Sequence, residues 1–522
     1  MRVTDPQKKL LWRSAIFLIT ITAVFLRWRL LLSMGSLWGD EAFTTHFAAI
    51  PLKLGLAYLS YDTHPPLHYL LVHFWFLIFG SSDIALRALS IVWSALWIPL
   101  IIALGHLFFN RTVALVAGLF SALSPLMIYY GVDGRMYGLL ILLSTVSMFF
   151  FWKWAGAEES PTIPPSSKIA TSKNRSFFWW LFFSSALVLT HSTGAAAVAA
   201  QAIFLFVRHF KNLRQLFSVR RMIFGFLIVA TIFLLWFIPT AQKRYANSSA
   251  SQEWQFSSEG DTIWNISQSI LWLPAGELES AVGIIVALAF LLAAFSRVRA
   301  APVQLILIWT LAVLIPFSFV PHIVPRFIMA AAPAIILLAA FGLTSLVERV
   351  RQKKIAAVII TAGMLMVFYL MSSGVVVMFG ERLYNWDRAA AWIMAREKTD
   401  DLLVHGWFGN QIPLGRYLRG ERKITSFYPF KDHLSLEDAY VRHISQLTIK
   451  ESALDEFLNL AGENRRIFFM PGMHLVIEGD GETLFGTKSI ARQLEWWTER
   501  GWKVMDEFPF DGKTAPVWLL ER

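Results

Sequence analysis

The sequence predicts a polytopic α-helical membrane protein of about eleven transmembrane helices, followed by a soluble α/β domain. Hydrophobic residues make up 56% of the 522-residue chain and charged residues only 16%, unlike a soluble domain. Apolar runs long enough to cross a ~30 Å hydrocarbon layer recur from Leu11 to about Met378. Residues 380–522 return to a mixture of charges, aromatics and strand-like runs. We therefore expect two domains, a transmembrane domain at 1–379 with a large first outer loop at 33–83, and an extracytoplasmic α/β domain at 380–522.

The predicted spans are apolar runs, and they cover residues 11–32, 84–108, 113–131, 137–154, 177–190, 194–208, 222–240, 280–296, 302–320, 326–346 and 355–378. Residues 64–80, "HPPLHYLLVHFWFLIFG", are also apolar, but only ~14 of them follow the prolines, too few to span. We expect this segment to form a helix at the membrane surface. Residues 177–208 fit either two short helices hinged at "THSTG" or one long helix.

Charge distribution orients the predicted spans. With 64–80 at the surface, the basic loops between spans all fall on the side of Lys8 and Lys9, which the positive-inside rule makes cytoplasmic. The net charge of +11 is thus an orientation signal and predicts no nucleic-acid partner. The apolar run after the basic N-terminus lacks a small-residue cleavage site, so we expect a retained span. The chain has no cysteine, which excludes disulfides, thiolate metal sites and cysteine nucleophiles.

Two adjacent acids, Asp40 and Glu41 in "LWGDEAF", follow the first span on the predicted outer face. Acids are common where a helix leaves the bilayer. A carboxylate at this boundary can also act as a general base that takes a proton from an attacking hydroxyl. Only the neighbouring motifs can distinguish an acid that marks the end of a helix from a general base.

A histidine and two prolines open the outer motif "DTHPPLHY". The prolines fit the first turn of an amphipathic helix. They can equally stiffen a turn that holds His64 over a cavity, with His68 one helical turn further on. Asp62, His64 and His68 can be drawn as a metal cluster, but the ligand pattern is weak and we assign no metal residue.

The outer motif "YYGVDGRMYG" places Asp133, Arg135 and Tyr137 at alternate positions. An arginine beside a membrane is often a snorkelling anchor. Arg135 would also supply an always-charged fork suited to a phosphate, and Arg87 and Arg326 at outer helix ends invite the same interpretation. Together, a candidate base, several cations and aromatics at one membrane face fit an enzyme whose donor has a lipid tail and a phosphate head.

The motifs "WGDEAF", "HPPLHYLL", "FGSSDIALRALS", "GVDGRMYGLL" and "VPRFIMAAAP" follow one another in an order that resembles a known family. The sequence is similar to the bacterial relatives of protein O-mannosyltransferases and of the lipid A aminoarabinose transferase, in the GT-C class of polyprenyl-phosphate-sugar-dependent glycosyltransferases. The likeness covers roughly residues 10–350. It implies a GT-C-like fold and inverting transfer of a monosaccharide from a polyprenyl-phosphate carrier to an acceptor hydroxyl on the extracytoplasmic face.

The resemblance also implies roles for individual residues. Asp40 matches the acidic position that acts as catalytic base in the family, and Glu41 matches its acidic neighbour. The remaining matches belong to the donor and phosphate site, and they are His64, Arg87, Asp133, Arg135, Tyr137 and, more weakly, Arg326. Gly134 stands where many relatives have alanine. Some relatives use a divalent cation, so this cofactor stays open.

The implied partners are a polyprenyl-phosphate-linked sugar, a glycan, lipid or protein acceptor, and the lipid bilayer of a bacterial inner (plasma) membrane. Short strands and amphipathic helices in residues 380–522 predict an α/β module that binds the acceptor, caps the cavity or only packs. A transporter or flippase of lipid-linked sugars is the main alternative, although it would keep polar groups at midmembrane. A noncatalytic membrane scaffold is a third.

Overall fold

The computed structural model describes residues 5–60, 64–155, 167–209, 220–247, 299–317, 324–350, 358, 379, 382–399, 401–405, 408–418, 424–426, 449–450, 465–472, 474–476, 483–509 and 514–522. The chain divides into two compact units. The helical unit comprises residues 1–32, 64–239 and 259–381, and the α/β unit comprises residues 33–63, 240–258 and 382–522. The predicted first outer loop is thus divided, since its first half belongs to the α/β unit.

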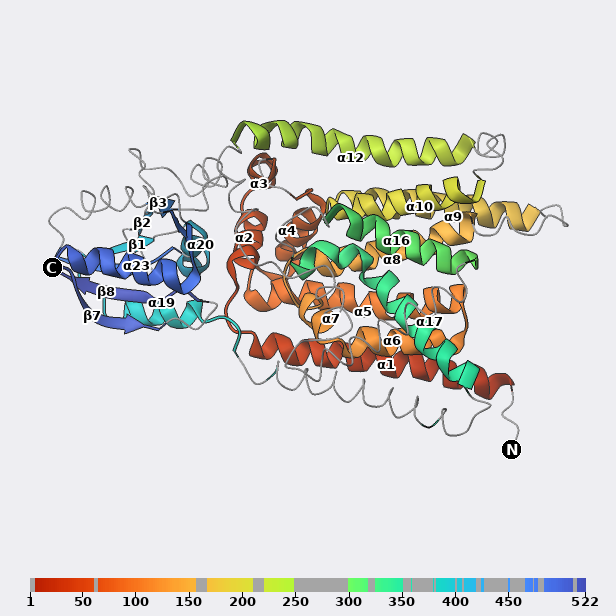
Figure 1. The fold of residues 1–522 in the computed structure, drawn as a ribbon, viewed down its shortest axis with the longest axis horizontal. Coiled ribbons are helices and arrows are strands. Elements are labelled where there is room, and N and C mark those ends of the chain that lie inside the picture. The colour runs from red at the N-terminus through yellow and green to blue at the C-terminus, as the bar shows by residue number, and fades with distance from the viewer. Residues whose placement is uncertain are drawn as a thin grey trace. The chain divides into compact units, whose positions relative to one another are not determined.

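Helices make up the described part of the helical unit (Figure 1). They are α1 (Asp5–Ser33), α4 (Leu67–Phe79), α5 (Asp83–Phe108), α6 (Arg111–Leu123), α7 (Pro125–Tyr130), α8 (Tyr137–Ala155), α9 (Ser167–Val188), α10 (Thr193–His209), α12 (Arg220–Asn247), α16 (Ala301–Phe317), the 3-10 helix η3 (Pro325–Ala331) and α17 (Ala332–Val350). Five helical stretches in the described residues are long and apolar enough to cross a membrane. The predicted spans at 280–296 and 355–378 lie outside the described residues, apart from Val358.

The predicted span at 113–131 is two helices, because Pro125 interrupts it. Proline has no N–H, so the carbonyl of Ser121 has no helical partner four residues on. The buried side chain of Arg27 donates to that carbonyl at 3.0 Å and to the carbonyl of Met127 at 3.1 Å. Ser124 caps α7 by accepting a hydrogen bond from the N–H of Met127 at 3.3 Å. One arginine from α1 therefore satisfies backbone groups that the break exposes.

Residues 177–208 form two helices, α9 and α10, which end and begin around the "THSTG" segment. Buried polar side chains connect them to α8. The indole N–H of Trp180 donates to Gln201 at 2.7 Å, and the Gln201 amide donates to Ser147 at 2.9 Å. Ser147 in turn pairs with Ser184 at 2.8 Å. Such interhelical hydrogen bonds hold apolar helices together where burial alone gives no preference.

The proline-rich segment at 64–80 forms the short helix α4, which starts at Leu67, after Pro66. Figure 1 shows α4 turned across the direction of the long helices. Its indole at Trp75 donates to the carbonyl of Ala85 at 2.8 Å, and the N–H of Leu67 donates to the carbonyl of Leu189 at 3.0 Å. Thirteen helical residues cover roughly 20 Å, which is shorter than the hydrocarbon layer. The location of α4 at the membrane surface stays a prediction.

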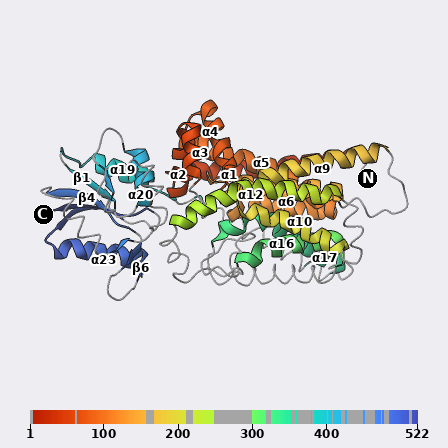
Figure 2. The same ribbon diagram turned by 90° about the horizontal axis from the view of Figure 1, so that it is seen from above.

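The α/β unit contains a five-stranded sheet with the order β2-β1-β4-β8-β7. Strands β1 (Leu402–His405), β2 (Ile424–Ser426) and β4 (Arg466–Met470) are parallel, whereas β7 (Lys503–Phe508) and β8 (Val517–Glu521) pair antiparallel. Figure 2 shows α23 (Gly486–Glu499) on one face and α19 (Trp386–Met394) and α20 (Phe408–Tyr417) on the other. A second sheet has the order β3-β5-β6, from Ile449–Lys450, His474–Val476 and Thr483–Phe485.

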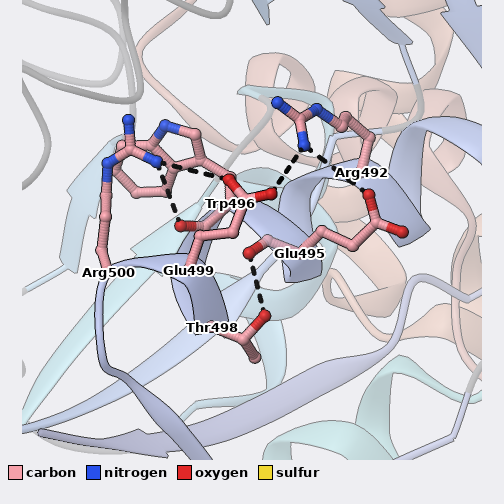
Figure 3. A network of polar contacts seen from close by, with 6 residues as sticks. All are labelled: Arg492, Glu495, Trp496, Thr498, Glu499 and Arg500. Carbon is pink, nitrogen blue, oxygen red and sulfur yellow. Dashed lines mark hydrogen bonds and ion pairs between the residues drawn. The ribbon is translucent and has the colours of Figure 1, made fainter.

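Alternation along the strands fills a hydrophobic core on each face of the larger sheet. Val404, Phe469 and Trp518 pack with the tryptophans of α23, while Leu403, Phe468 and Leu519 pack with α19 and α20. The exposed side of α23 carries the ion pairs of Figure 3, in which Arg492 lies 3.3 Å from Glu499 and Arg500 stacks over Trp496. Exposed pairs of this kind stabilise a fold only slightly.

The α/β unit also includes the segment that follows α1, with helices α2 (Gly39–Ala49) and α3 (Leu52–Leu59). Gly35 forms a bridge with Tyr384 and has a φ of +76°, a conformation that glycine adopts at least cost. A Cβ at Gly35 would clash with the Tyr384 carbonyl and the Arg382 side chain. The backbone at position 35 can lie this close to residues 382–384 only because glycine has no side chain.

Candidate functional site

A buried cation lies where α4 meets the loop before α8. Arg135 is 3% exposed, and its guanidinium donates a hydrogen bond of 3.1 Å to the hydroxyl of Tyr69. The guanidinium carbon is also 5.9 Å from the centre of the Tyr69 ring. Both the ring and the hydroxyl of Tyr69 therefore contact the guanidinium of Arg135. These contacts restrict the directions in which the remaining N–H groups of Arg135 can point.

His68 packs beside this arginine as a neutral imidazole. Its Nε2 lies 3.2 Å from the carbonyl of Gly134, which can only accept, so Nε2 carries the proton. Burial, followed by the positive charge of Arg135, lowers the pKa of His68 to about 3. The other ring nitrogen, Nδ1, has no hydrogen-bond partner within the part of the chain that the structure describes. His68 thus presents a hydrogen-bond acceptor next to a fixed cation.

His64 and His191 bring the N-terminal end of α4 to the hinge between α9 and α10. Their ring centres are 5.2 Å apart, and the ring of Tyr137 is 6.0 Å from that of His191. Nδ1 of His191 lies 2.8 Å from the hydroxyl oxygen of Thr193 and 3.2 Å from its backbone nitrogen, so the start of α10 fixes the orientation of the imidazole. His191 lies in the "THSTG" hinge, and its imidazole is buried beside His64 and Tyr137.

The other residues predicted for the donor site belong to further elements of the helical unit. Asp133 is fully buried, and its backbone carbonyl accepts the hydroxyl of Ser90 in α5 at 2.7 Å. Arg87 is buried near the start of α5, one of the helices that pack on α4. Arg326 lies in η3 with its guanidinium 5.9 Å from the ring of Phe327.

Asp40 belongs to the α/β unit, in the first turn of α2. Asp40 as a whole residue is half-buried. The positive end of the helix dipole favours an anion in this turn. The hydroxyl of Thr44 donates to the backbone carbonyl of Asp40 at 2.9 Å, which ties the first turn to the second.

Glu41 has a different environment from its neighbour. It is fully buried, and its carboxylate accepts the N–H of Trp38 at 3.3 Å. This bond satisfies an N–H that has no helical partner, as in a capping box. The two acids that look equivalent in the sequence therefore differ, since Asp40 is half-buried whereas Glu41 is fully buried and supports the helix start.

The described contacts bring together the predicted residues His64, Arg135 and Tyr137. They are joined by His68, which the sequence placed one turn after His64, and by Tyr69 and His191, to which the sequence assigned no site role. Tyr69 directly follows His68 in the "HPPLHY" motif, which was the only available signal for it. Among the described residues, no group of three or more His, Asp or Glu side chains is placed to hold a metal ion; Asp62 lies outside them.

One protein-family model matches part of the sequence. Residues 63–163, about a fifth of the chain, match the family model described as dolichyl-phosphate-mannose-protein mannosyltransferase. That stretch contains α4, the whole of α5 and the Arg135 loop, whereas Asp40 precedes it. No match was found among curated proteins.

Solved structures show the same fold over nearly the whole chain. ArnT from Cupriavidus metallidurans bound to undecaprenyl phosphate matches with a TM-score of 0.60 and 14% identity, covering 99% of this chain and 98% of that one. The apo form of ArnT matches with a TM-score of 0.58 and 13% identity, and the match covers 97% of each chain. The oligosaccharyltransferase AglB from Archaeoglobus fulgidus, in complex with an inhibitory peptide and a dolichol-phosphate, matches with a TM-score of 0.58 and 12% identity. This match covers 89% of this chain and 70% of AglB.

Proposed function

We propose that this chain, which has the GT-C fold of ArnT and AglB, is a membrane glycosyltransferase that uses a polyprenyl-phosphate-linked sugar. The resemblance to the GT-C class inferred from the motifs is confirmed in the fold. The observation that carries the activity is the buried Arg135, held by Tyr69 beside the neutral His68, within the stretch that matches the mannosyltransferase family model. An always-charged group in a dry site is suited to an anionic phosphate.

In this proposal Asp40 is the general base. Its carboxylate takes the proton from the acceptor hydroxyl, and the acceptor oxygen attacks the anomeric carbon of the donor. The bond from that carbon to the phosphate oxygen breaks with its electron pair, so the sugar inverts and polyprenyl phosphate leaves. Partial exposure of Asp40 at a helix N-terminus supports this role, whereas the buried capping contact of Glu41 supports a structural one.

The departing phosphate gains negative charge, and cations stabilise it. Arg135 is the principal candidate, with Arg87 and Arg326 contributing positive charge and His64 contributing a hydrogen bond. Tyr137 and Asp133 shape the loop that carries Arg135, because they flank it and are both buried. No step of this scheme passes through a metal ion.

The sugar, the acceptor and the cellular setting belong to the same proposal. The charge pattern of the sequence and the family resemblance support a bacterial inner membrane, with the catalytic motifs and residues 380–522 on the extracytoplasmic face. Transfer there needs a donor that is already across the bilayer, which a lipid carrier provides.

A reconstituted transfer assay tests the proposal. Purified protein in lipid nanodiscs is incubated with polyprenyl-phosphate sugars that carry a label on the sugar, together with membrane extracts as acceptor. We expect a new labelled glycoside with inverted anomeric configuration and one released polyprenyl phosphate per transfer. Donor binding without a new glycosidic bond, or movement of intact donor across liposomes, would instead support the transporter alternative.

A further inference from the structure

The loop that precedes Asp40 is held by side chains from the other end of the chain. The N–H of Leu37 donates a hydrogen bond of 2.7 Å to the phenolic oxygen of Tyr417, the last residue of α20. This is a short bond for an N–H donor and an oxygen acceptor. Leu37 is three residues before Asp40, so the bond fixes the chain directly ahead of α2.

The ring of Tyr417 is itself anchored. It packs against the core that lies between the sheet and helices α19 and α20, which includes Leu414 and Phe468. Helix α20 also packs along α2. A tyrosine whose ring is fixed in a core presents its hydroxyl at a defined position, because the ring leaves only the O–H rotor free.

A second attachment lies one residue before Leu37. The hydroxyl of Ser36 accepts the N–H of Trp386 at 2.8 Å, and the N–H of Ser36 donates to the carbonyl of Tyr384 at 3.2 Å. The Tyr384 ring stacks on Trp38 with centres 6.4 Å apart. Consecutive residues 36, 37 and 38 are thus each bound to a residue of 384–417.

We infer that Tyr417 is a positioning residue for Asp40, and that the C-terminal α/β module acts as the scaffold that aims the base. The inference rests on the proposed function for its effect on catalysis, but the attachment itself is a property of the α/β unit alone. It gives residues 382–522 a role in turnover, where the sequence left acceptor binding, capping and packing open.

The test compares Tyr417→Phe with Thr498→Val, which removes one exposed hydroxyl from α23. Loss of one hydrogen bond to the Leu37 N–H should lower kcat about fivefold to tenfold. Donor KM should stay unchanged, because a displaced base impairs the chemical step and not donor binding. Hydrogen exchange should accelerate in peptides covering 34–49 and stay unchanged in peptides covering 486–499. Thr498→Val should match the wild type in every measurement.

Two outcomes overturn the inference. Unchanged kcat and unchanged exchange at 34–49 in Tyr417→Phe would show that the hydroxyl does not hold the loop. Accelerated exchange throughout the α/β unit with a lowered Tm would show a general structural role. Measuring Asp40→Asn in the same assay distinguishes failure of the Tyr417 inference from failure of the proposed function. If Asp40→Asn retains transfer, the assignment of Asp40 as the base fails. The hydrogen-exchange data still decide whether Tyr417 holds the start of α2.

Discussion

The two units position their functional residues over very different chain separations. In the helical unit, Arg135 and the Tyr69 hydroxyl that it contacts are 66 positions apart, and both come from segments next to helix ends. In the α/β unit, Leu37 and Tyr417 are 380 positions apart. The cluster around Arg135 is therefore assembled by segments close together in the sequence, whereas the start of α2 is held by Tyr384, Trp386 and Tyr417, which lie about 350–380 positions later. Mutations in the two units should consequently have separable effects.

Gly35→Ala should have the largest effect on the α/β side. The Cβ would clash with the Tyr384 carbonyl, and alanine would have to adopt a φ of +76°. We expect a loss of about 2–4 kcal/mol in the local stability of the 34–49 segment. Hydrogen exchange at 34–49 measures it, with donor affinity unchanged. Gly415→Ala is the matched control, since a Cβ there meets no atom within 4 Å; equal damage from both would reject the explanation.

Arg135→Gln should have the complementary effect on the helical side. Removal of a buried charge that binds an anion should weaken donor binding by ~100-fold, and Tyr69→Phe by about fivefold. Exchange in the α/β unit should not change. Titration of a fluorescent polyprenyl-phosphate analogue gives the affinities, with Arg221→Gln on exposed α12 as control. Wild-type affinity in Arg135→Gln would remove this residue from the donor site.

The sequence predicted the helical unit better than the site around Asp40. The length of the apolar runs was enough to predict α1, α5 and α8, because a helix must have a minimum length to cross a bilayer. It missed the break at Pro125, because the group that compensates for it, Arg27, lies about a hundred residues earlier. Contiguous motifs pointed to Arg135 and His64, but Tyr417 carries no local signal: its partner is a backbone N–H, which any residue supplies.

Acidification should weaken the α/β unit through His405, the last residue of β1. Burial lowers its pKa to about 3, so it is neutral in the folded state and gains a proton on unfolding below its ordinary value of 6.5. The contribution of His405 to the free energy of unfolding is therefore fully present above about pH 6.5 and is lost as the pH falls towards about 3. At pH 5.5 the loss is about 1.4 kcal/mol. Denaturant titration at pH 7.5 and 5.5, compared between wild type and His405→Leu, isolates this group. An identical pH dependence in both proteins would contradict it.

The smallest effect is expected at the surface of α23. Arg492→Ala removes exposed ion pairs to Glu495 and Glu499, which should cost no more than about 0.5 kcal/mol. Transfer activity should be that of the wild type, because these ion pairs lie within and next to α23 and involve no residue of 34–49. A loss above tenfold in activity would show that α23 has a function that its contacts do not indicate.

Asp40→Asn tests the central claim most directly, because it removes the proposed base and keeps the size of the side chain. Turnover of a labelled polyprenyl-phosphate sugar and donor affinity are measured on the same purified, folded preparation. We expect turnover to fall at least ~1000-fold, with donor affinity within about threefold of the wild type. Substantial transfer by a stably folded Asp40→Asn protein would contradict the account.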